Sequence, residues 1–229
     1  MDERRLSPTR IGVIGSGEVG KRFSSAFASL GHDVIIGARE PERDDLRRWH
    51  ETQTGALRAG TYEEAATHGD LVILAVLGIA VAEAIEQARP ANLAGKVLID
   101  ATNPLDFSEG FPPKLAWGHT DSGGERVQRA APKARVVKAF NIIGNPYFVN
   151  PRFHEGQPTM FIAGSDEEAK ALVADVLHDF GWPPPIDCGD IEGARYLEPL
   201  AILWVRIIGT RGASDHAFKL LTDAEGEAE

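Results

Sequence analysis

Short runs of apolar residues alternate along the chain with stretches in which apolar positions recur every three or four residues. The first pattern is typical of strands buried on both faces, and the second is typical of helices with one buried face. Strands are expected at 10–15, 32–39, 56–60, 70–76, 96–102, 135–140, 159–164 and 184–189. Helices are expected before Gly31 and at 40–51, 80–89, 122–131, 165–181 and 194–209, the last with an interruption near Pro199, and Thr61 with Glu64 is expected to cap a further short helix. Such alternation predicts an α/β protein with a doubly wound, mostly parallel sheet.

The pattern restarts after about residue 150, which divides the expected structure. Residues 10–150 are expected to form the main domain, and residues 151–221 a small C-terminal α/β extension packed on it. Residues 1–9 are expected to be disordered, as is the acidic tail at 222–229, where charged and small residues predominate.

The stretch "IGVIGSGEVG" places Gly15, Gly17 and Gly20 at G-x-G-x-x-G spacing between a predicted strand and a predicted helix. In a dinucleotide site the first glycine allows a tight turn, the second lets a diphosphate approach, and the third permits close helix–strand packing. The context predicts an NAD(P)-binding Rossmann fold. A tight turn with incidental glycines is the alternative. Glu18 is expected to point away from the phosphates, where it favours the first helical turn.

Arginines follow the second strand, where an NAD site would carry Asp or Glu against the ribose. Arg39 occupies that place, and Arg43 lies one helical turn later. Two guanidinium groups can clamp a 2′-phosphate, which favours NADP as the cofactor. Glu40 as a shifted ribose ligand, or a solvated helix face carrying both arginines, is the alternative.

Polar residues at other strand ends are the remaining candidates for chemistry. Asn103 and Asn141 follow the fifth and sixth strands, and His119 lies in the long loop 103–120. They form no acid–base pair, so the catalytic residues stay undetermined and positioning is expected to matter most. Lys138 is expected to be a strand residue with a solvated ammonium group, or alternatively a general acid.

Composition narrows the classes of partner. The 229-residue chain has 34 acidic and 24 basic residues, for a net charge of -10, which argues against binding nucleic acid or an anionic membrane. The apolar run 71–82 is too short to span a bilayer, and the N-terminus lacks a signal-peptide pattern. The single cysteine, Cys188, permits no internal disulfide, and the dispersed histidines predict no metal site. We therefore expect a cytoplasmic protein, dimeric through the apolar helix 194–209, that acts on a small molecule.

Five segments carry a family resemblance: "IGVIGSGEVG", "GHDVIIGAR", "LVILAV", "DATNP" and "VVKAFN". In order and spacing they resemble the deazaflavin-dependent NADP reductase family and the soluble dinucleotide-binding domain of six-transmembrane ferric reductases. The resemblance covers about residues 10–165. It implies an oxidoreductase that passes hydride between the nicotinamide of NADP(H) and a flavin-like or deazaflavin acceptor. Together with the motifs, it predicts a cofactor site at Gly15, Ser16, Gly17, Glu18, Val19, Gly20, Ala38, Arg39, Arg43, Val76, Leu77, Val81, Asn103, Pro104 and Ala139.

Two further hypotheses stay open. One is an NADP-linked dehydrogenase or imine reductase of a small metabolite. The other is a non-catalytic NADP(H)-sensing module, which would bind the nucleotide without turning it over.

Overall fold

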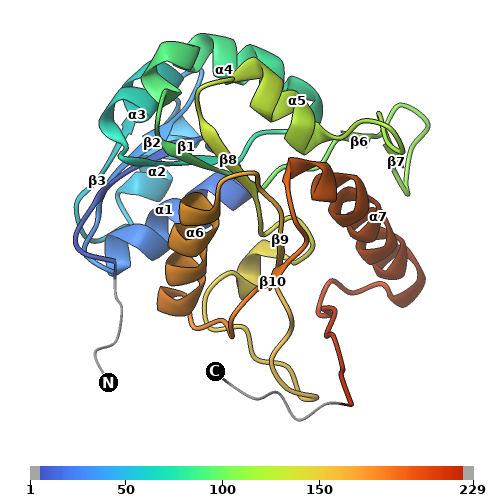
Figure 1. The fold of residues 1–229 in the computed structure, drawn as a ribbon. Helices are drawn as coiled ribbons and strands as arrows, with labels where there is room; N and C mark the ends of the chain where they lie inside the picture. The colour runs from blue at the N-terminus through green and yellow to red at the C-terminus, as the bar shows by residue number, and fades with distance from the viewer. Residues whose placement is uncertain (1–5, 224–229) are drawn as a thin grey trace.

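The computed structural model describes residues 6–223, drawn in colour in Figure 1. The expected disorder at 1–5 and at 224–229 lies outside the described residues. Order begins before residue 10, because the backbone N–H of Leu6 donates to the carboxylate of Asp179 at 3.0 Å, which corrects the expected boundary.

A six-stranded parallel sheet forms the centre of the molecule, in the order β3-β2-β1-β4-β5-β8. The order reverses between β1 and β4, where consecutive crossovers leave in opposite directions, so the predicted doubly wound sheet is confirmed. The strands of this sheet are β1 (Arg10–Ile14), β2 (Asp33–Gly37), β3 (Leu57–Gly60), β4 (Leu71–Leu74), β5 (Val97–Asp100) and β8 (Arg135–Lys138).

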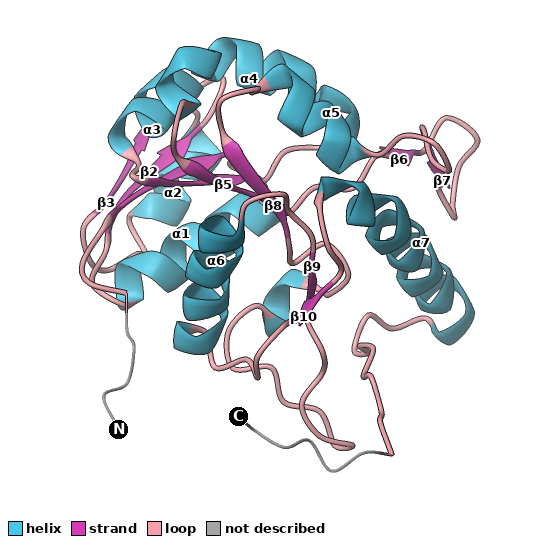
Figure 2. Cartoon of the chain, viewed as in Figure 1, coloured by secondary structure: helices cyan, strands magenta, loops and turns pink. Residues whose placement is uncertain are grey.

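Helices cover both faces of the sheet (Figure 2). One face packs against α3, α4 and α5, and the other packs against α1 and α6, with α2 beside β3. The helices are α1 (Glu18–Ser29), α2 (Asp44–His50), α3 (Tyr62–His68), α4 (Val81–Ala88), α5 (Gly123–Ala130), α6 (Glu167–Asp179) and α7 (Ala194–Arg211). Single 3-10 turns lie at η1 (Gly78–Ala80), η2 (Pro90–Leu93), η3 (Asn145–Tyr147) and η4 (Ile191–Gly193).

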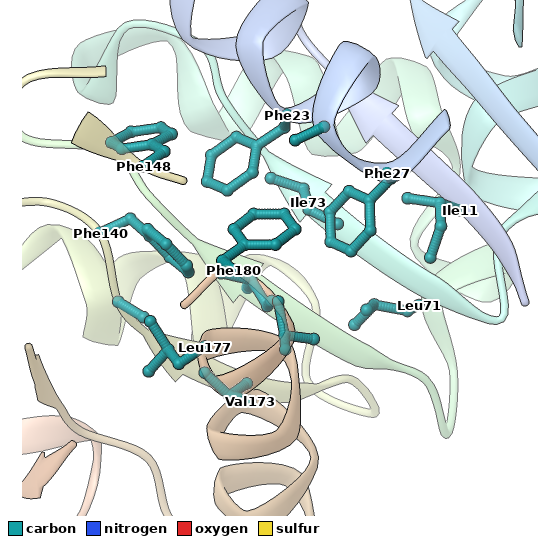
Figure 3. Close-up of a cluster of buried hydrophobic side chains, with 14 of the residues drawn as sticks. Ile11, Phe23, Phe27, Leu71, Ile73, Phe140, Phe148, Val173, Leu177 and Phe180 are labelled. Carbon is teal, nitrogen blue, oxygen red and sulfur yellow. The ribbon is translucent and has the colours of Figure 1, made fainter. Parts of the chain in front are cut away.

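Aromatic rings dominate the core between α1 and α6 (Figure 3). Phe23 of α1 lies edge-on to Phe140, with the ring centroids 5.1 Å apart, and 4.6 Å from Phe148. Phe27 contacts Phe180, which follows α6, at 4.9 Å. These contacts join the glycine-motif helix to the C-terminal part of the chain, so the two parts share one core.

The C-terminal segment adds a second, two-stranded parallel sheet of β9 (Phe161–Ile162) and β10 (Ile186–Asp187). An antiparallel bridge between Lys138 and Ala163 joins it to the edge of the main sheet. Helix α7 then packs on α5, and it continues through Pro199 without the expected interruption. Pro199 is exposed, whereas Leu197, Glu198 and Ala201 of the same helix are buried.

The expected long loop 103–120 contains a small antiparallel hairpin, β6 (Leu105–Asp106) and β7 (Lys114–Leu115). In Figure 1 this hairpin projects from the sheet beside the start of α7.

Candidate dinucleotide site

A cavity of about 560 Å³ opens along the carboxyl ends of the central strands. Its volume lies within the range of roughly 300–1,000 Å³ that is usual for small-molecule sites. It also lies beside the point where the strand order reverses, which is where doubly wound sheets bind ligands. The lining residues are Gly15, Ser16, Gly17, Glu18, Val19, Arg39, Arg43, Tyr62, Ala75, Val76, Leu77, Gly78, Ala80, Glu83, Ala84, Gln87, Ala101, Thr102, Asn103 and Leu105.

The three motif glycines have three different surroundings. Gly15 has φ +122°, and a Cβ there would lie 2.3 Å from the carbonyl oxygen of Ala75. A Cβ on Gly20 would lie 1.9 Å from the carbonyl oxygen of Gly15, so helix and turn touch directly at this point. A Cβ on Gly17 would meet nothing within 4 Å, which leaves the space that a diphosphate needs.

Helix α1 begins directly at this open space. Its N-cap, Gly17, has no side chain to accept from the N–H groups of the first turn. Free N–H groups and the positive end of the helix dipole favour a bound anion. The Glu18 side chain is 81% exposed and lies 3.5 Å from the Lys21 ammonium, which offsets its charge. The residues present therefore fit a diphosphate.

One end of the cavity, which we call the arginine end, is formed by Arg39, Arg43, Tyr62, Glu83 and Gln87. Arg43 donates to the carbonyl oxygen of Ser16 at 2.9 Å, which ties α2 to the glycine turn. The exposed Arg39 guanidinium lines the cavity and forms no ion pair with any residue in 6–223. Burial raises the pKa of the Tyr62 phenol although Arg39 and Arg43 lower it, so the ring stays neutral at physiological pH.

Three members of the arginine end were not predicted from the sequence. Tyr62 follows β3 through its capping residue Thr61, and the strand-exit argument could have found it. Glu83 and Gln87 lie inside α4, where Gln87 Nε2 donates to Glu83 Oε1 at 2.9 Å. From the sequence alone, two residues four positions apart on a predicted helix give no indication that they line a cavity.

The opposite end, which we call the asparagine end, is formed by Leu77, Ala101, Thr102, Asn103 and Leu105. Asn103 Nδ2 donates to the carbonyl oxygen of Asn141 at 2.7 Å, and Asn141 Nδ2 donates back to Asn103 Oδ1 at 3.0 Å. Asn141 also donates to the carbonyl oxygen of Leu197 in α7 at 3.0 Å. Asn141 is 5% exposed and stands behind Asn103, outside the cavity lining.

Lys138 is fully buried, contrary to the expectation of a solvated ammonium group. Its Nζ lies 3.0 Å from Asp100 Oδ2 and 2.9 Å from Glu198 Oε1, and it donates to the carbonyl oxygen of Thr102 at 2.6 Å. Burial alone would lower the pKa of Lys138, but the two carboxylates outweigh burial and raise it. The expectation failed because the partner Glu198 comes from α7, far away in the sequence.

Five residues predicted for the cofactor lie outside the cavity lining. All five are buried. The prediction placed cofactor residues at strand ends, but it did not take into account that some of these side chains pack into the core, or that Gly20 serves the packing of the helix. They are Gly20, Ala38, Val81, Pro104 and Ala139. His119 is exposed at φ 61° and also lies outside the lining, so the structure does not bring it to the other candidates.

The strand order, the glycine turn and the position of the cavity define a dinucleotide-binding protein of the Rossmann class. Comparison with known proteins identifies the family. The family model described as "NADP oxidoreductase coenzyme F420-dependent" matches residues 10–104. The crystal structure of an Arthrobacter sp. FB24 protein assigned as an F420-dependent NADP reductase is 38% identical, with a TM-score of 0.89 over 93% of this chain and 100% of that one. The chain belongs to this family of oxidoreductases.

Two curated relatives show how far the likeness extends. The F420-dependent NADP reductase of Methanocaldococcus jannaschii is 28% identical over 202 residues, which cover 83% of this chain and 88% of its own. The rat metalloreductase STEAP3 is 28% identical over 85% of this chain, and the match spans 37% of the rat protein's length. In residues 6–223, no helix is long and apolar enough to cross a bilayer.

Proposed function

We propose that the protein binds NADP(H) with its 2′-phosphate at the arginine end and its nicotinamide at the asparagine end. The observation that carries the choice of NADP is the pair of guanidinium groups after β2, one of them without an ion-pair partner among the described residues. A 2′-phosphate supplies the counter-charge that Arg39 lacks. The open space at Gly17 supports the diphosphate position between the two ends.

We further propose that hydride passes directly between the nicotinamide and a deazaflavin-type acceptor, as the name of the Methanocaldococcus jannaschii relative suggests. NADPH, when bound, supplies the hydride. The residues at the asparagine end carry no ionisable side chain, so the proton that accompanies hydride in the reduction of a deazaflavin would come from solvent rather than from this part of the cavity. The exposed Leu77 offers an apolar edge against which a flat ring can lie. The contribution of the chain would be to orient two rings and exclude water.

Stopped-flow mixing of the purified protein with NADPH and one acceptor at a time tests this function. The acceptors are the deazaflavin F420, FAD, FMN and a cyclic imine. We expect rapid oxidation of NADPH with F420, slower oxidation with flavins, and none with the imine. Turnover with the imine alone would replace the proposal with an imine reductase. Tight binding without turnover of any acceptor would favour a sensing module.

Three less specific proposals accompany this one. We propose that residues 10–150 and 151–221 act as the cofactor-binding part and an extension packed on it. We propose a homodimer formed through α7, whose Leu203 is 48% exposed. A monomer in sedimentation velocity at micromolar concentration would contradict the dimer.

We propose action in the cytoplasm, which the single free cysteine permits and which fractionation of the source cells can test.

A further inference from the structure

The buried cluster of Lys138, Asp100 and Glu198 has no part in the proposed binding of phosphates or in hydride transfer. Each of the three side chains is at most 1% exposed. Burying charge is costly unless the groups are paired and hydrogen-bonded, and replacing such clusters by apolar residues often costs nothing. The presence of this cluster beside the cavity therefore calls for a role other than stability.

The cluster is connected to the asparagine end through Thr102. Lys138 Nζ donates to the carbonyl oxygen of Thr102 at 2.6 Å. Asp100 Oδ1 accepts from the Thr102 backbone N–H at 3.0 Å and from its hydroxyl at 2.7 Å. Thr102 thus has its N–H, hydroxyl and carbonyl groups all bonded inside the cluster. The next residue, Asn103, lines the cavity.

Helix α7 completes the cluster from the other side. Besides Lys138, the carboxylate of Glu198 accepts from the backbone N–H groups of Gly123 at 2.8 Å and Gly124 at 3.0 Å, at the start of α5. The preceding residue, Leu197, accepts from Asn141, which holds Asn103. One turn of α7 therefore reaches the asparagine end by two separate chains of contacts.

The backbone between Lys138 and Asn141 has an unusual conformation. Phe140 is buried in the left-handed region, at φ 62°, and its N–H donates to Met160 Sδ at 3.3 Å. A bulky residue in this region stores strain, which surrounding contacts must offset. The strained residue lies between the two side chains that support Thr102 and Asn103.

We propose that Lys138 is a positioning residue, and that Glu198 of α7 holds it so that Thr102 and Asn103 present a fixed surface to the nicotinamide half of the cofactor. The inference rests on the proposed function, because it requires a ring at the asparagine end. It goes further in assigning the C-terminal helix a part in the site. It also predicts that the two ends of the cavity can be weakened independently.

A charge-balanced variant isolates the role of Lys138. Lys138→Met combined with Asp100→Asn removes one positive and one negative charge together. An asparagine at position 100 can still accept from Thr102, whereas the donor to the Thr102 carbonyl oxygen is lost. Glu198→Gln serves as a second variant, because it keeps one acceptor oxygen but loses the negative charge that faces Lys138.

The test compares two ligands by titration calorimetry. NADPH occupies both ends, whereas 2′-phospho-ADP-ribose lacks the nicotinamide and reaches only the arginine end and the glycine turn. We expect the charge-balanced variant to bind NADPH about tenfold more weakly, since small misplacements at a ring site are costly. Its affinity for 2′-phospho-ADP-ribose should stay within about twofold of the wild type, since a tenfold change corresponds to about 1.4 kcal/mol and no contact of the fragment is altered.

Lys170→Met is the matched control, because Lys170 is also buried and paired with two carboxylates, those of Asp187 and Glu167, but belongs to α6 and lies outside the cavity lining. It should leave both affinities unchanged. Equal weakening of both ligands by the Lys138 variant, unchanged binding of both, or selective loss of NADPH affinity in the control would overturn the inference. Failure of the wild type to bind either ligand would instead overturn the proposed function.

Discussion

The two ends of the cavity differ in whether their charged and polar side chains are paired within the protein. The arginine end leaves Arg39 without an ion-pair partner among residues 6–223. At the asparagine end, the side-chain amides of Asn103 and Asn141 bond to each other, and the Lys138 ammonium group behind them is buried between two carboxylates. The difference indicates that charge is left open where a phosphate is to supply the partner. Where a neutral ring is to be held in place, most polar groups already bond within the protein, and among the described residues the buried Asn141 Oδ1 is left without a hydrogen-bond partner.

The largest expected effect concerns the stability of the asparagine end. Lys138→Met alone leaves Asp100 and Glu198 facing each other in the core without a positive charge. We expect the free energy of unfolding to fall by about 3–5 kcal/mol, as is usual when one partner of a buried ion pair is removed. Urea unfolding followed by circular dichroism measures the loss.

Lys170→Met provides the comparison for that measurement. The side chains of its partners, Asp187 and Glu167, are 46% and 84% exposed, so they can be hydrated once the lysine is gone. Its loss should be clearly smaller. Equal losses for the two lysine variants would mean that the Lys138 cluster is no more isolated from water than a surface pair.

The next effect concerns the arginine end. Arg39→Ala with Arg43→Ala should weaken NADPH binding by at least about 100-fold, because two charge-assisted hydrogen bonds of roughly 1.5–3 kcal/mol each would be lost. NADH has no 2′-phosphate, so its affinity should change by no more than about threefold. Fluorescence titration of both nucleotides gives the two dissociation constants.

Arg48→Ala is the matched control for the arginine pair, since Arg48 is exposed on the same helix, α2, but lies outside the cavity lining. It should affect neither nucleotide. If the double variant weakened NADH and NADPH equally, the arginines would not read the 2′-phosphate.

A smaller effect separates two glycines of the motif. Gly17→Ala places a methyl group in open space, so the protein should keep its stability while its affinity for NADPH falls about tenfold. Gly20→Ala forces a methyl group to within 1.9 Å of the Gly15 carbonyl oxygen, and should cost about 1–3 kcal/mol of stability by overpacking. Thermal unfolding and NADPH titration of both variants distinguish the two roles. Loss of stability in Gly17→Ala would mean that this glycine serves the fold.

The smallest effect depends on pH and involves the junction of α5 and α7 beside the asparagine end. Arg195 forms two hydrogen bonds, of 2.8 and 2.5 Å, with the Glu125 carboxylate and holds the pKa of Glu125 below its ordinary value of 4.5. A depressed carboxyl pKa stabilises the fold fully above pH 4.5, and the contribution is lost as the pH falls through the folded-state value. The stability difference between wild type and Glu125→Gln should therefore be constant from neutral pH to about pH 5 and shrink below that. A difference that grew on acidification would contradict this assignment.

Much of the arginine end could be predicted from the sequence, because the motifs that form it lie close together along the chain. The turn at Gly15, the open N-terminus of α1 and the arginines after β2 all follow from spacing within one βαβ unit. The parallel sheet was predicted for the same reason, since each strand carries its own apolar pattern. Gly31, which follows α1 at φ +90°, and the capping box of Thr61 with Glu64 are further local features that the sequence carries.

Leu77 and Asn103 of the asparagine end were predicted from strand ends, but the contacts that hold this end in place could not be derived in this way. Its contacts join residues far apart in the chain, such as Asn141 with Leu197 and Lys138 with Glu198. A single sequence gives no reason to pair a lysine in one strand with a glutamate in a distant helix, so Lys138 was predicted to be solvated. His119 was chosen because its loop follows β5, but proximity in sequence did not bring it to the cavity.

A crystal structure of the protein soaked with NADP⁺ tests the central claim most directly, because it locates both ends of one ligand. We expect the diphosphate over Gly17, the 2′-phosphate within hydrogen-bond distance of Arg39 and Arg43, and the nicotinamide against Thr102 and Asn103. A nucleotide bound elsewhere, or one whose 2′-phosphate faces solvent while the arginines keep their present contacts, would contradict the account.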